Sequence, residues 1–216
     1  IDFEGVNYPD KILRIMTTDD LGKLMPGLES ITYLFNAGKS VSFLRMPDCW
    51  RIILRVPEAV DEKTATSIEW ITDRLREVLP SWTTPPGIVD LDIYSVSRRI
   101  ASRYREGRVF LAGDSAHVTN TRGGMNMNCG IHDSYEIANA LVAALKAGRP
   151  DLVEAAADER LRVAREMLIP RTDRNITGGV AWLDKIKAMA ASPSESTEYL
   201  ATAAMLDMVT RPLRVA

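Results

Sequence analysis

Residues 108–134, RVFLAGDSAHVTNTRGGMNMNCGIHDS, carry the most informative pattern in this chain. Its apolar start, RVFLAG, predicts a short strand that is buried on both faces, as in the sheet of an α/β domain. Asp114 ends that strand, where open α/β sheets place their ligand crevice, and its carboxylate would accept hydrogen bonds from ligand hydroxyls. The glycine pair Gly123 and Gly124 then lets a ligand approach the main chain closely.

A helix follows this glycine loop. We expect it to open near Cys129 and to stop at Gly148, because apolar residues recur at helical spacing up to that glycine. The residues of this stripe are Ile131, Tyr135, Ala138, Leu141, Val142 and Leu145. Unpaired N–H groups and the positive end of the helix dipole would favour an electron-rich ligand group. The stretch therefore predicts a ligand with hydroxyls at one end and an anion-prone group at the other.

The first hundred residues are rich in strand patterns. Residues 31–36, 39–46 and 50–56 predict successive strands of an antiparallel sheet. In the third strand the alternating residues Trp50, Ile52, Leu54 and Val56 share one face, so that face should meet a helix. The stripe from Thr64 to Val78 predicts this covering helix. Residues 88–96 predict one more strand.

Composition excludes several classes of partner. The 216 residues are 46% hydrophobic and 26% charged, with a formal net charge of -2, so no global field favours nucleic acid or an anionic membrane. No apolar run approaches the roughly 20 residues that cross a bilayer, and the N-terminus lacks a signal-peptide pattern. The two cysteines are too few for a disulfide framework. We therefore expect a cytoplasmic protein with a small-molecule or protein partner.

The opening stretch resembles the second flavin-binding motif of the FAD-dependent aromatic hydroxylases, the single-component flavoprotein monooxygenases typified by para-hydroxybenzoate hydroxylase. The matching segments are RVFLAGDSAH at 108–117, the glycine pair, and MNCGIHDS at 127–134. IDFEG at the start, TTDDLGKLMPGL at 17–28 and DERLRVARE at 158–166 extend the similarity to about Glu166. The resemblance implies an enzyme that uses FAD, NADH or NADPH, and O2 to hydroxylate an aromatic, phenolic or polyketide-like substrate.

The resemblance also implies site residues, position by position. Asp114 would accept a hydrogen bond from the ribityl chain of FAD, and backbone amides near Met127 and Asn128 would meet the N1 and C2 carbonyl edge of the flavin ring. The implied cofactor-binding residues are Gly113, Asp114, Gly123, Gly124, Asn126, Met127 and Asn128. The catalytic residues stay unassigned.

This chain departs from the family pattern in three respects. Asn120 and Thr121 stand where the family usually has prolines, and Asn126 stands where it usually has glycine. The chain also carries neither the GxGxxG motif that holds the pyrophosphate nor the DG motif before the substrate sheet. We therefore expect the C-terminal portion of a hydroxylase, which supplies half of an FAD site and needs either the missing N-terminal half or self-association.

With that resemblance, the expected fold class is α+β. Residues 1–105 would form a substrate-binding β-rich domain, with an antiparallel or mixed sheet and a covering helix. Residues 106–150 would hold the last strand, the glycine loop and the helix of an incomplete FAD-binding α/β domain, and residues 151–216 would form C-terminal helices. A solvated helix face with salt-bridge spacing would comprise Glu159, Arg160, Arg162, Arg165 and Glu166.

Candidate substrate residues lie in the predicted sheet. Tyr33 and Phe35 share one face of a strand, as do Phe43 and Arg45, and an aromatic substrate could lie against such a face with Arg45 as an anchor. The competing interpretation is that these aromatic side chains are core and Arg45 is a surface charge.

The same residues leave several alternative functions open. The departures Asn120, Thr121 and Asn126 would also suit a flavin oxidase or an epoxidising relative. A catalytically silent fragment that binds a partner or dimerises is a further alternative. His117, Cys129 and His132 could be imagined as zinc ligands, but a fourth ligand is lacking, so we expect no metal site. The absence of a G-x-S-x-G elbow argues against a hydrolase.

Overall fold

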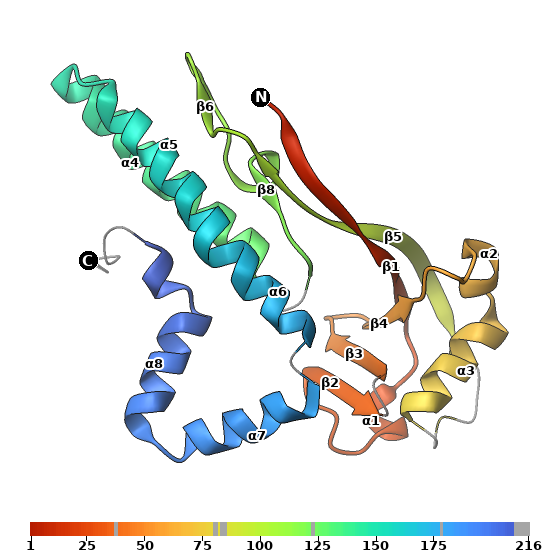
Figure 1. The fold of residues 1–216 in the computed structure, drawn as a ribbon. Helices are drawn as coiled ribbons and strands as arrows, with labels where there is room; N and C mark the ends of the chain where they lie inside the picture. The colour runs from red at the N-terminus through yellow and green to blue at the C-terminus, as the bar shows by residue number, and fades with distance from the viewer. Residues whose placement is uncertain (37–38, 80–81, 83–85, 122–123, 178, 210–216) are drawn as a thin grey trace. The chain divides into compact units, whose positions relative to one another are not determined.

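The structure is a computed structural model that describes residues 1–36, 39–79, 82, 86–121, 124–177 and 179–209 (Figure 1). The side chains of residues 35–36 and 175–183 lie outside this description. The chain divides into two compact units, one of Asn7–Val96 and one that combines Ile1–Val6 with Ser97–Ala216. Two long strands, β1 (Phe3–Thr17) and β5 (Ile88–Ala101), contribute residues to both units. Helices and a mainly antiparallel sheet make the fold α+β, as expected.

The first unit contains the predicted antiparallel strands. They are β2 (Ile31–Asn36), β3 (Lys39–Arg45) and β4 (Trp50–Val56). The hydrogen-bonded order of the sheet is β2-β3-β4-β1-β5-β8, and β1 pairs with β4 in antiparallel register. Burial alternates strictly along β4, so one face of the sheet carries the core.

Helix α3 (Ile68–Val78) covers that face, as the sequence predicts. Its residues Ile71 and Leu75 are fully buried with Ile52 and Phe43 of the sheet. The sequence predicts one helix from Thr64, but the structure has a separate short helix α2 (Glu62–Ala65) before α3. The break occurs because the Ser67 hydroxyl caps α3 and accepts the Trp70 N–H at 3.3 Å. A further short helix, α1 (Leu21–Leu24), precedes β2.

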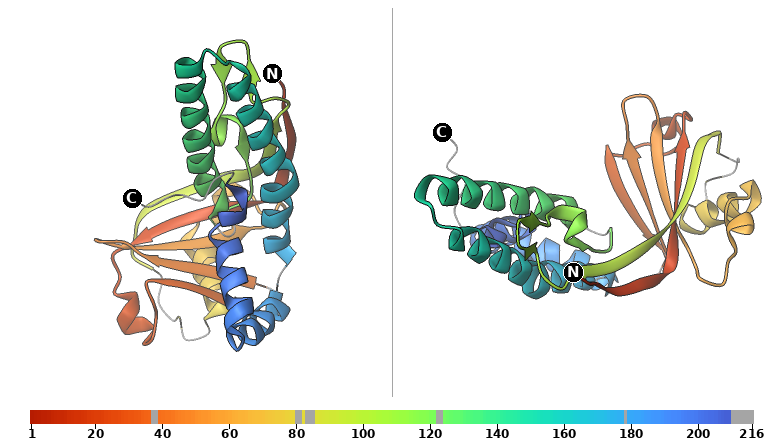
Figure 2. Two further views of the ribbon diagram at one scale, coloured as in Figure 1. Left: turned by 90° about the vertical axis from the view of Figure 1, so that its left-hand side faces the viewer. Right: turned by 90° about the horizontal axis from the view of Figure 1, so that it is seen from above.

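The second unit is mainly helical. Its long elements are α4 (Met125–Ala147) and α5 (Asp151–Val163), which lie side by side along their length (Figure 2). A π-helical turn at Ala164–Leu168 leads into α6 (Ile169–Thr177), α7 (Gly179–Ala190), α8 (Pro193–Ala203) and a 3-10 turn at Leu206–Met208. In the described part of the chain, no helix combines the length and apolarity that crossing a membrane requires.

The prediction for RVFLAG is wrong. This segment forms only the short strand β7 (Val109–Phe110), which pairs with β6 (Arg105–Glu106) in a separate two-stranded sheet. Val109 is 60% exposed. The strand is not buried on both faces because, among the described residues, β6 is its sheet partner and nothing continues the sheet beyond it.

Helix α4 is confirmed, but it begins earlier than predicted and buries a different face. It starts at Met125 because Gly124 adopts a left-handed conformation (φ 61°) that ends the loop and lets the helix begin. Most of the predicted apolar stripe is exposed, including Ile131 at 58% and Leu145 at 82%. The side of α4 that is buried instead carries Cys129, Asp133, Ile137 and Ala144.

Candidate functional site

Asp114 lies at the tip of a tight turn. The turn is a 3-10 segment, Gly113–Ser115, followed by the short strand β8 (His117–Val118). Gly113 takes a left-handed conformation (φ 61°), and the Ser115 hydroxyl accepts the Ala112 N–H at 3.2 Å and donates to the Ala112 carbonyl at 2.8 Å. These bonds close the turn and leave the Asp114 side chain exposed. The carboxylate therefore stands where a ligand hydroxyl could reach it.

The turn packs directly against α4 through two glycines. A methyl group on Gly130 would stand 2.8 Å from the Cα of Gly113, a distance that real side chains do not show. In addition, the Gly113 N–H donates to the Asp133 carboxylate at 3.3 Å. Both contacts hold the Asp114 turn at a fixed distance from the first turns of α4.

The N-terminus of α4 offers backbone N–H groups to a ligand. Its N-cap, Gly124, has no side chain to cap the helix, and the first turn holds no acidic residue. Helical hydrogen bonds run from the N–H of one residue to the carbonyl four residues earlier, so Asn128 is the first residue of α4 that can bond to the Gly124 carbonyl. The N–H groups of Asn126 and Met127, which precede it, have no carbonyl partner within the helix. The Asn128 side-chain amide also donates to that carbonyl at 3.0 Å. This end of the helix suits an electron-rich group.

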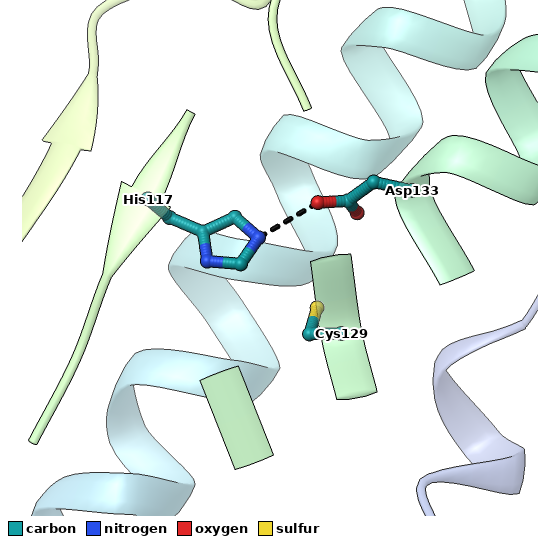
Figure 3. Close-up of side chains that lie close together, drawn as sticks. All are labelled: His117, Cys129 and Asp133. Carbon is teal, nitrogen blue, oxygen red and sulfur yellow. Dashed lines mark hydrogen bonds and ion pairs between the residues drawn. The ribbon is translucent and has the colours of Figure 1, made fainter. Parts of the chain in front are cut away.

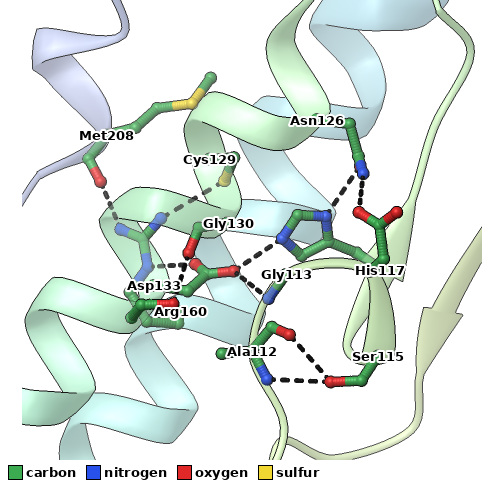
Figure 4. Close-up of polar contacts among 12 residues, drawn as sticks. Ala112, Gly113, Ser115, His117, Asn126, Cys129, Gly130, Asp133, Arg160 and Met208 are labelled. Carbon is green, nitrogen blue, oxygen red and sulfur yellow. Dashed lines mark hydrogen bonds and ion pairs between the residues drawn. The ribbon is translucent and has the colours of Figure 1, made fainter.

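A buried polar cluster lies beneath the turn and the helix. His117 Nε2 lies 2.7 Å from Asp133 Oδ2, and Arg160 Nε donates to Asp133 Oδ1 at 2.7 Å (Figure 3; Figure 4). Arg160 also donates to the Met208 carbonyl and to the Cys129 sulfur, the latter at 3.4 Å (Figure 4). The His117 and Asp133 side chains have no exposed surface and Arg160 has 1%, so the cluster is sealed from solvent.

Charge pairing sets the protonation states of this cluster. Burial alone would lower the pKa of His117, but the hydrogen bond to Asp133 and the neighbouring Cys129 sulfur outweigh it and raise that pKa to about 10. Burial would likewise raise the pKa of the Asp133 carboxyl, yet the hydrogen bond and charge of His117, together with Arg160, hold it below its ordinary value. At neutral pH the cluster therefore contains an imidazolium, a carboxylate and a guanidinium.

The cluster reaches the surface through Asn126. His117 Nδ1 lies 3.0 Å from Asn126 Oδ1 (Figure 4). The Asn126 amide nitrogen donates to Asp114 Oδ1 at 2.8 Å. The structure thus brings together Asp114, Gly113 and Asn126, which the sequence assigns to one site. Gly124, Met127 and Asn128 follow on the same helix start, and Gly123 lies outside the described residues.

The sequence did not predict the roles of two cluster residues, Arg160 and Asp133. Arg160 is expected on a solvated helix face, and that expectation is wrong because the side chain is buried against Asp133. The neighbouring prediction of an Arg162–Glu166 ion pair is confirmed at 2.9 Å. Asp133 receives no role from the sequence, although its place four residues after Cys129 puts both on one side of α4. A carboxylate on the same helix side as a cysteine would have been the sequence signal for a buried polar residue at Asp133.

The imagined zinc set is not the set that the structure assembles. Within the described residues, ligand atoms of His117, Cys129 and Asp133 lie within 4.8 Å of one another, with Asp133 in place of His132 (Figure 3). The Arg160 guanidinium donates to both Asp133 and Cys129. A cation therefore already pairs with the carboxylate and contacts the sulfur, so these two atoms have a positively charged partner in the structure as it stands.

The candidate substrate residues lie on opposite faces of the sheet. Tyr33 pairs with Ser42, whereas Phe43 pairs with Thr32, and residues directly opposite in an antiparallel pair share a face. Phe43 is fully buried in the core, while Tyr33 is 64% exposed. Arg45 is exposed, with its guanidinium 6.0 Å from the Trp50 ring centre. The side chain of Phe35 lies outside the described residues.

The Asp114 turn and the start of α4 form a candidate ligand site, and comparison with known proteins identifies the family of the chain. A family model described as an FAD binding domain matches residues 1–169. The chain therefore belongs to this family, the FAD-dependent aromatic monooxygenases, which confirms the resemblance found in its sequence.

Individual relatives are consistent with that family. The chain is 27% identical over 176 residues to 6-hydroxy-3-succinoylpyridine 3-monooxygenase of Pseudomonas putida, covering 81% of this chain and 44% of the relative. It is 37% identical over 111 residues to para-nitrophenol 4-monooxygenase of a Pseudomonas strain, covering 50% of this chain and 27% of the relative. The chain thus spans less than half the length of these curated relatives.

Solved structures show the same fold. A p-nitrophenol 4-monooxygenase from Pseudomonas putida superposes with a TM-score of 0.78 at 22% identity, over 97% of this chain and 55% of that protein. An aklavinone-11 hydroxylase solved in a ternary complex with FAD and aklavinone has a TM-score of 0.65 at 28% identity, over 79% of this chain and 32% of that protein.

Proposed function

We propose that this chain is the substrate-domain and second-flavin-motif portion of an FAD-dependent monooxygenase. The enzyme would hydroxylate an aromatic, phenolic or polyketide-like substrate with O2 and with NADH or NADPH. The observation that carries this proposal is the exposed Asp114 carboxylate, held by a closed turn against the uncapped start of α4 in a member of an FAD-binding family. In this proposal residues 1–105 serve the substrate and residues 106–150 serve the flavin.

The residues present fit FAD. The Asp114 carboxylate is an acceptor for the ribityl hydroxyls, and the N–H groups at the start of α4 suit the electron-rich edge of the flavin ring. No acidic residue in that first turn opposes negative charge on the ring. FAD, when bound, supplies the electron transfer and oxygen activation, while the protein binds and orients it and excludes water.

Exposed apolar side chains on α4 and β7 support the proposal that another polypeptide segment binds this chain. Met127, Ile131, Val142 and Leu145 are each more than half exposed on α4, and Val109 is 60% exposed on β7. Burying such side chains stabilises an assembly, so a further polypeptide segment is expected to cover them. That segment would be the N-terminal FAD-binding half or a second copy of this chain. Both described cysteines are free thiols, which supports action in the cytoplasm.

A second candidate function keeps the flavin and changes the chemistry. Asn126 stands where the family usually has glycine, and its side chain contacts Asp114 directly. A changed group next to the flavin would suit an oxidase or an epoxidising relative. Such an oxidase would consume O2 and release hydrogen peroxide without a hydroxylated product.

A flavin titration tests the proposal. FAD is added to the purified chain while flavin fluorescence and the visible spectrum are followed, first for the wild type and then for Asp114→Ala. The control is Asp158→Asn, which removes the charge of an exposed aspartate on α5. Saturable binding that is weakened by Asp114→Ala and unchanged by Asp158→Asn supports the proposal. Binding that Asp114→Ala leaves unchanged contradicts the role of Asp114, and absence of binding would mean that flavin binding requires the missing N-terminal half.

Activity assays then separate the two kinds of chemistry. Oxidation of NADH or NADPH is measured with a panel of phenols, together with O2 consumption, hydrogen peroxide yield and product mass. A mass increase of one oxygen atom in a phenol supports the hydroxylase. Peroxide without an oxygenated product favours the oxidase.

A further inference from the structure

The contacts around Asn126 form one continuous polar chain from the core to the surface. The chain runs from Arg160 to Asp133, then to His117, Asn126 and Asp114, with successive distances of 2.7, 2.7, 3.0 and 2.8 Å. Its inner members are sealed from solvent, Asn126 is partly buried, and Asp114 is exposed. An exposed carboxylate is thus connected to a rigid, buried ion pair.

Hydrogen-bond chemistry gives this chain a direction. Both nitrogens of the His117 ring face acceptors, Asp133 Oδ2 on one side and Asn126 Oδ1 on the other. The ring must therefore donate on both sides, which only the imidazolium form does. With its oxygen committed to His117, the Asn126 amide presents its nitrogen to Asp114, and a carboxylate can accept that bond. The formal charges of Arg160, Asp133, His117 and Asp114 alternate in sign and balance.

We infer that Asn126 is a positioning residue that orients the Asp114 carboxylate before a ligand arrives. This inference rests on the proposed function for the ligand itself, a flavin with hydroxyls on its side chain. A carboxylate at the tip of an exposed turn would otherwise sample several rotamers, and fixing it in advance lowers the entropy cost of binding. The orientation comes from the buried imidazolium, which is itself locked by Asp133 and Arg160.

The ligand arm of the test compares two flavins. Riboflavin carries the ribityl hydroxyls, and lumiflavin lacks them. Asn126→Ala is expected to weaken riboflavin binding by about tenfold or more, the loss of one hydrogen bond to a charged group, and to leave lumiflavin binding unchanged. Asn139→Ala, which truncates an exposed asparagine on the same helix, is the matched control. Equal losses for both flavins would overturn the inference, because Asn126 would then act on the ring and not through Asp114.

A second arm needs no flavin. Side-chain amide resonances of Asn126 and their hydrogen exchange are followed by NMR in the wild type, in Asp114→Ala and in His117→Gln. We expect each substitution to shift these resonances and to speed their exchange, while the Asn139 amide stays unchanged. An Asn126 amide that responds to neither substitution overturns the inference. If the chain binds neither flavin, flavin binding requires the other half of the site, and the NMR result alone decides the role of Asn126.

Discussion

His117 and Asp133 are joined by a 2.7 Å contact between Nε2 and Oδ2, and neither side chain has any surface exposed to solvent. One residue comes from β8 and the other from α4. The contact therefore ties the strand that follows the Asp114 turn to the helix that follows the glycine loop. Because Arg160 of α5 binds the second oxygen of Asp133, three elements of the helical unit depend on a single carboxylate.

Removing that carboxylate charge should destabilise the protein strongly. Asp133→Asn leaves the His117 and Arg160 cations buried without their counter-charge, and breaking a buried pair in this way costs about 3–5 kcal/mol. Urea unfolding followed by circular dichroism measures the change. Asp158→Asn, on the exposed face of α5, is the control and should leave the midpoint unchanged. Equal stability of both variants would contradict the assignment of the cluster as a charge-paired core.

The stability of the protein should also fall in mildly alkaline solution. The pKa of His117 rises on folding from 6.5 to about 10, so its stabilising contribution is fully present below pH 6.5 and is lost as the pH rises towards 10. The titratable groups next to the ring are Asp133 and Cys129 on α4 and Tyr104, whose ring lies 6.3 Å away, while the neutral Asn126 faces Nδ1. The test is to measure the free energy of unfolding between pH 6 and pH 10, the range that the two pKa values of His117 span.

His117→Gln supplies the comparison for that pH series. The variant lacks the titrating group, so its free energy of unfolding should vary less than that of the wild type across the same range. Parallel curves for the two proteins would show that the imidazolium is not stabilised by folding. Asp133 affects stability in acid instead. Because folding lowers its pKa below 3.8, the stabilisation that its carboxylate provides is present above pH 3.8 and is lost as the pH falls further.

A single methyl group should disturb the joint between the Asp114 turn and α4. In Gly130→Ala the new Cβ would stand 2.8 Å from the backbone Cα of Gly113, so the turn and the helix must separate. Overpacking of this kind costs about 1–3 kcal/mol. Thermal unfolding measures the loss. Gly22→Ala is the matched control, because the nearest atom to its new Cβ is a side-chain oxygen of Asp20 at 3.4 Å, an ordinary contact distance. A Gly130→Ala protein as stable as the control would contradict the close packing.

The two candidate substrate aromatics should respond differently to truncation. Phe43→Ala removes a fully buried ring from the sheet core, and such changes cost about 3–5 kcal/mol. Tyr33 is 64% exposed, so Tyr33→Ala should change the free energy of unfolding little. Chemical denaturation of both variants gives the comparison. A stable Phe43→Ala variant would favour a substrate-facing ring over a packing role.

Sequence alone determined much of this protein. The strands of the first unit and the helix that covers them follow from local periodicity, because each element buries one face. The long helix after the glycine loop was also predicted, although the face that it buries was not. The family followed from the motif of aspartate, glycines and helix in residues 108–134, even though the strand predicted before the aspartate is only two residues long. These predictions depend only on residues that lie close together in the chain, so one sequence is enough to make them.

Which polar residues are buried depends on tertiary packing and could not be predicted from the sequence. Arg160 carries the same local pattern as the exposed Arg162, yet one is locked against Asp133 and the other pairs with Glu166 in solvent. The pattern along α4 likewise cannot show that its apolar stripe is exposed, because burial depends on which element packs against each side. The link from Arg160 through His117 to Asp114 joins residues distant in the chain, and long-range packing alone brings them within hydrogen-bond distance.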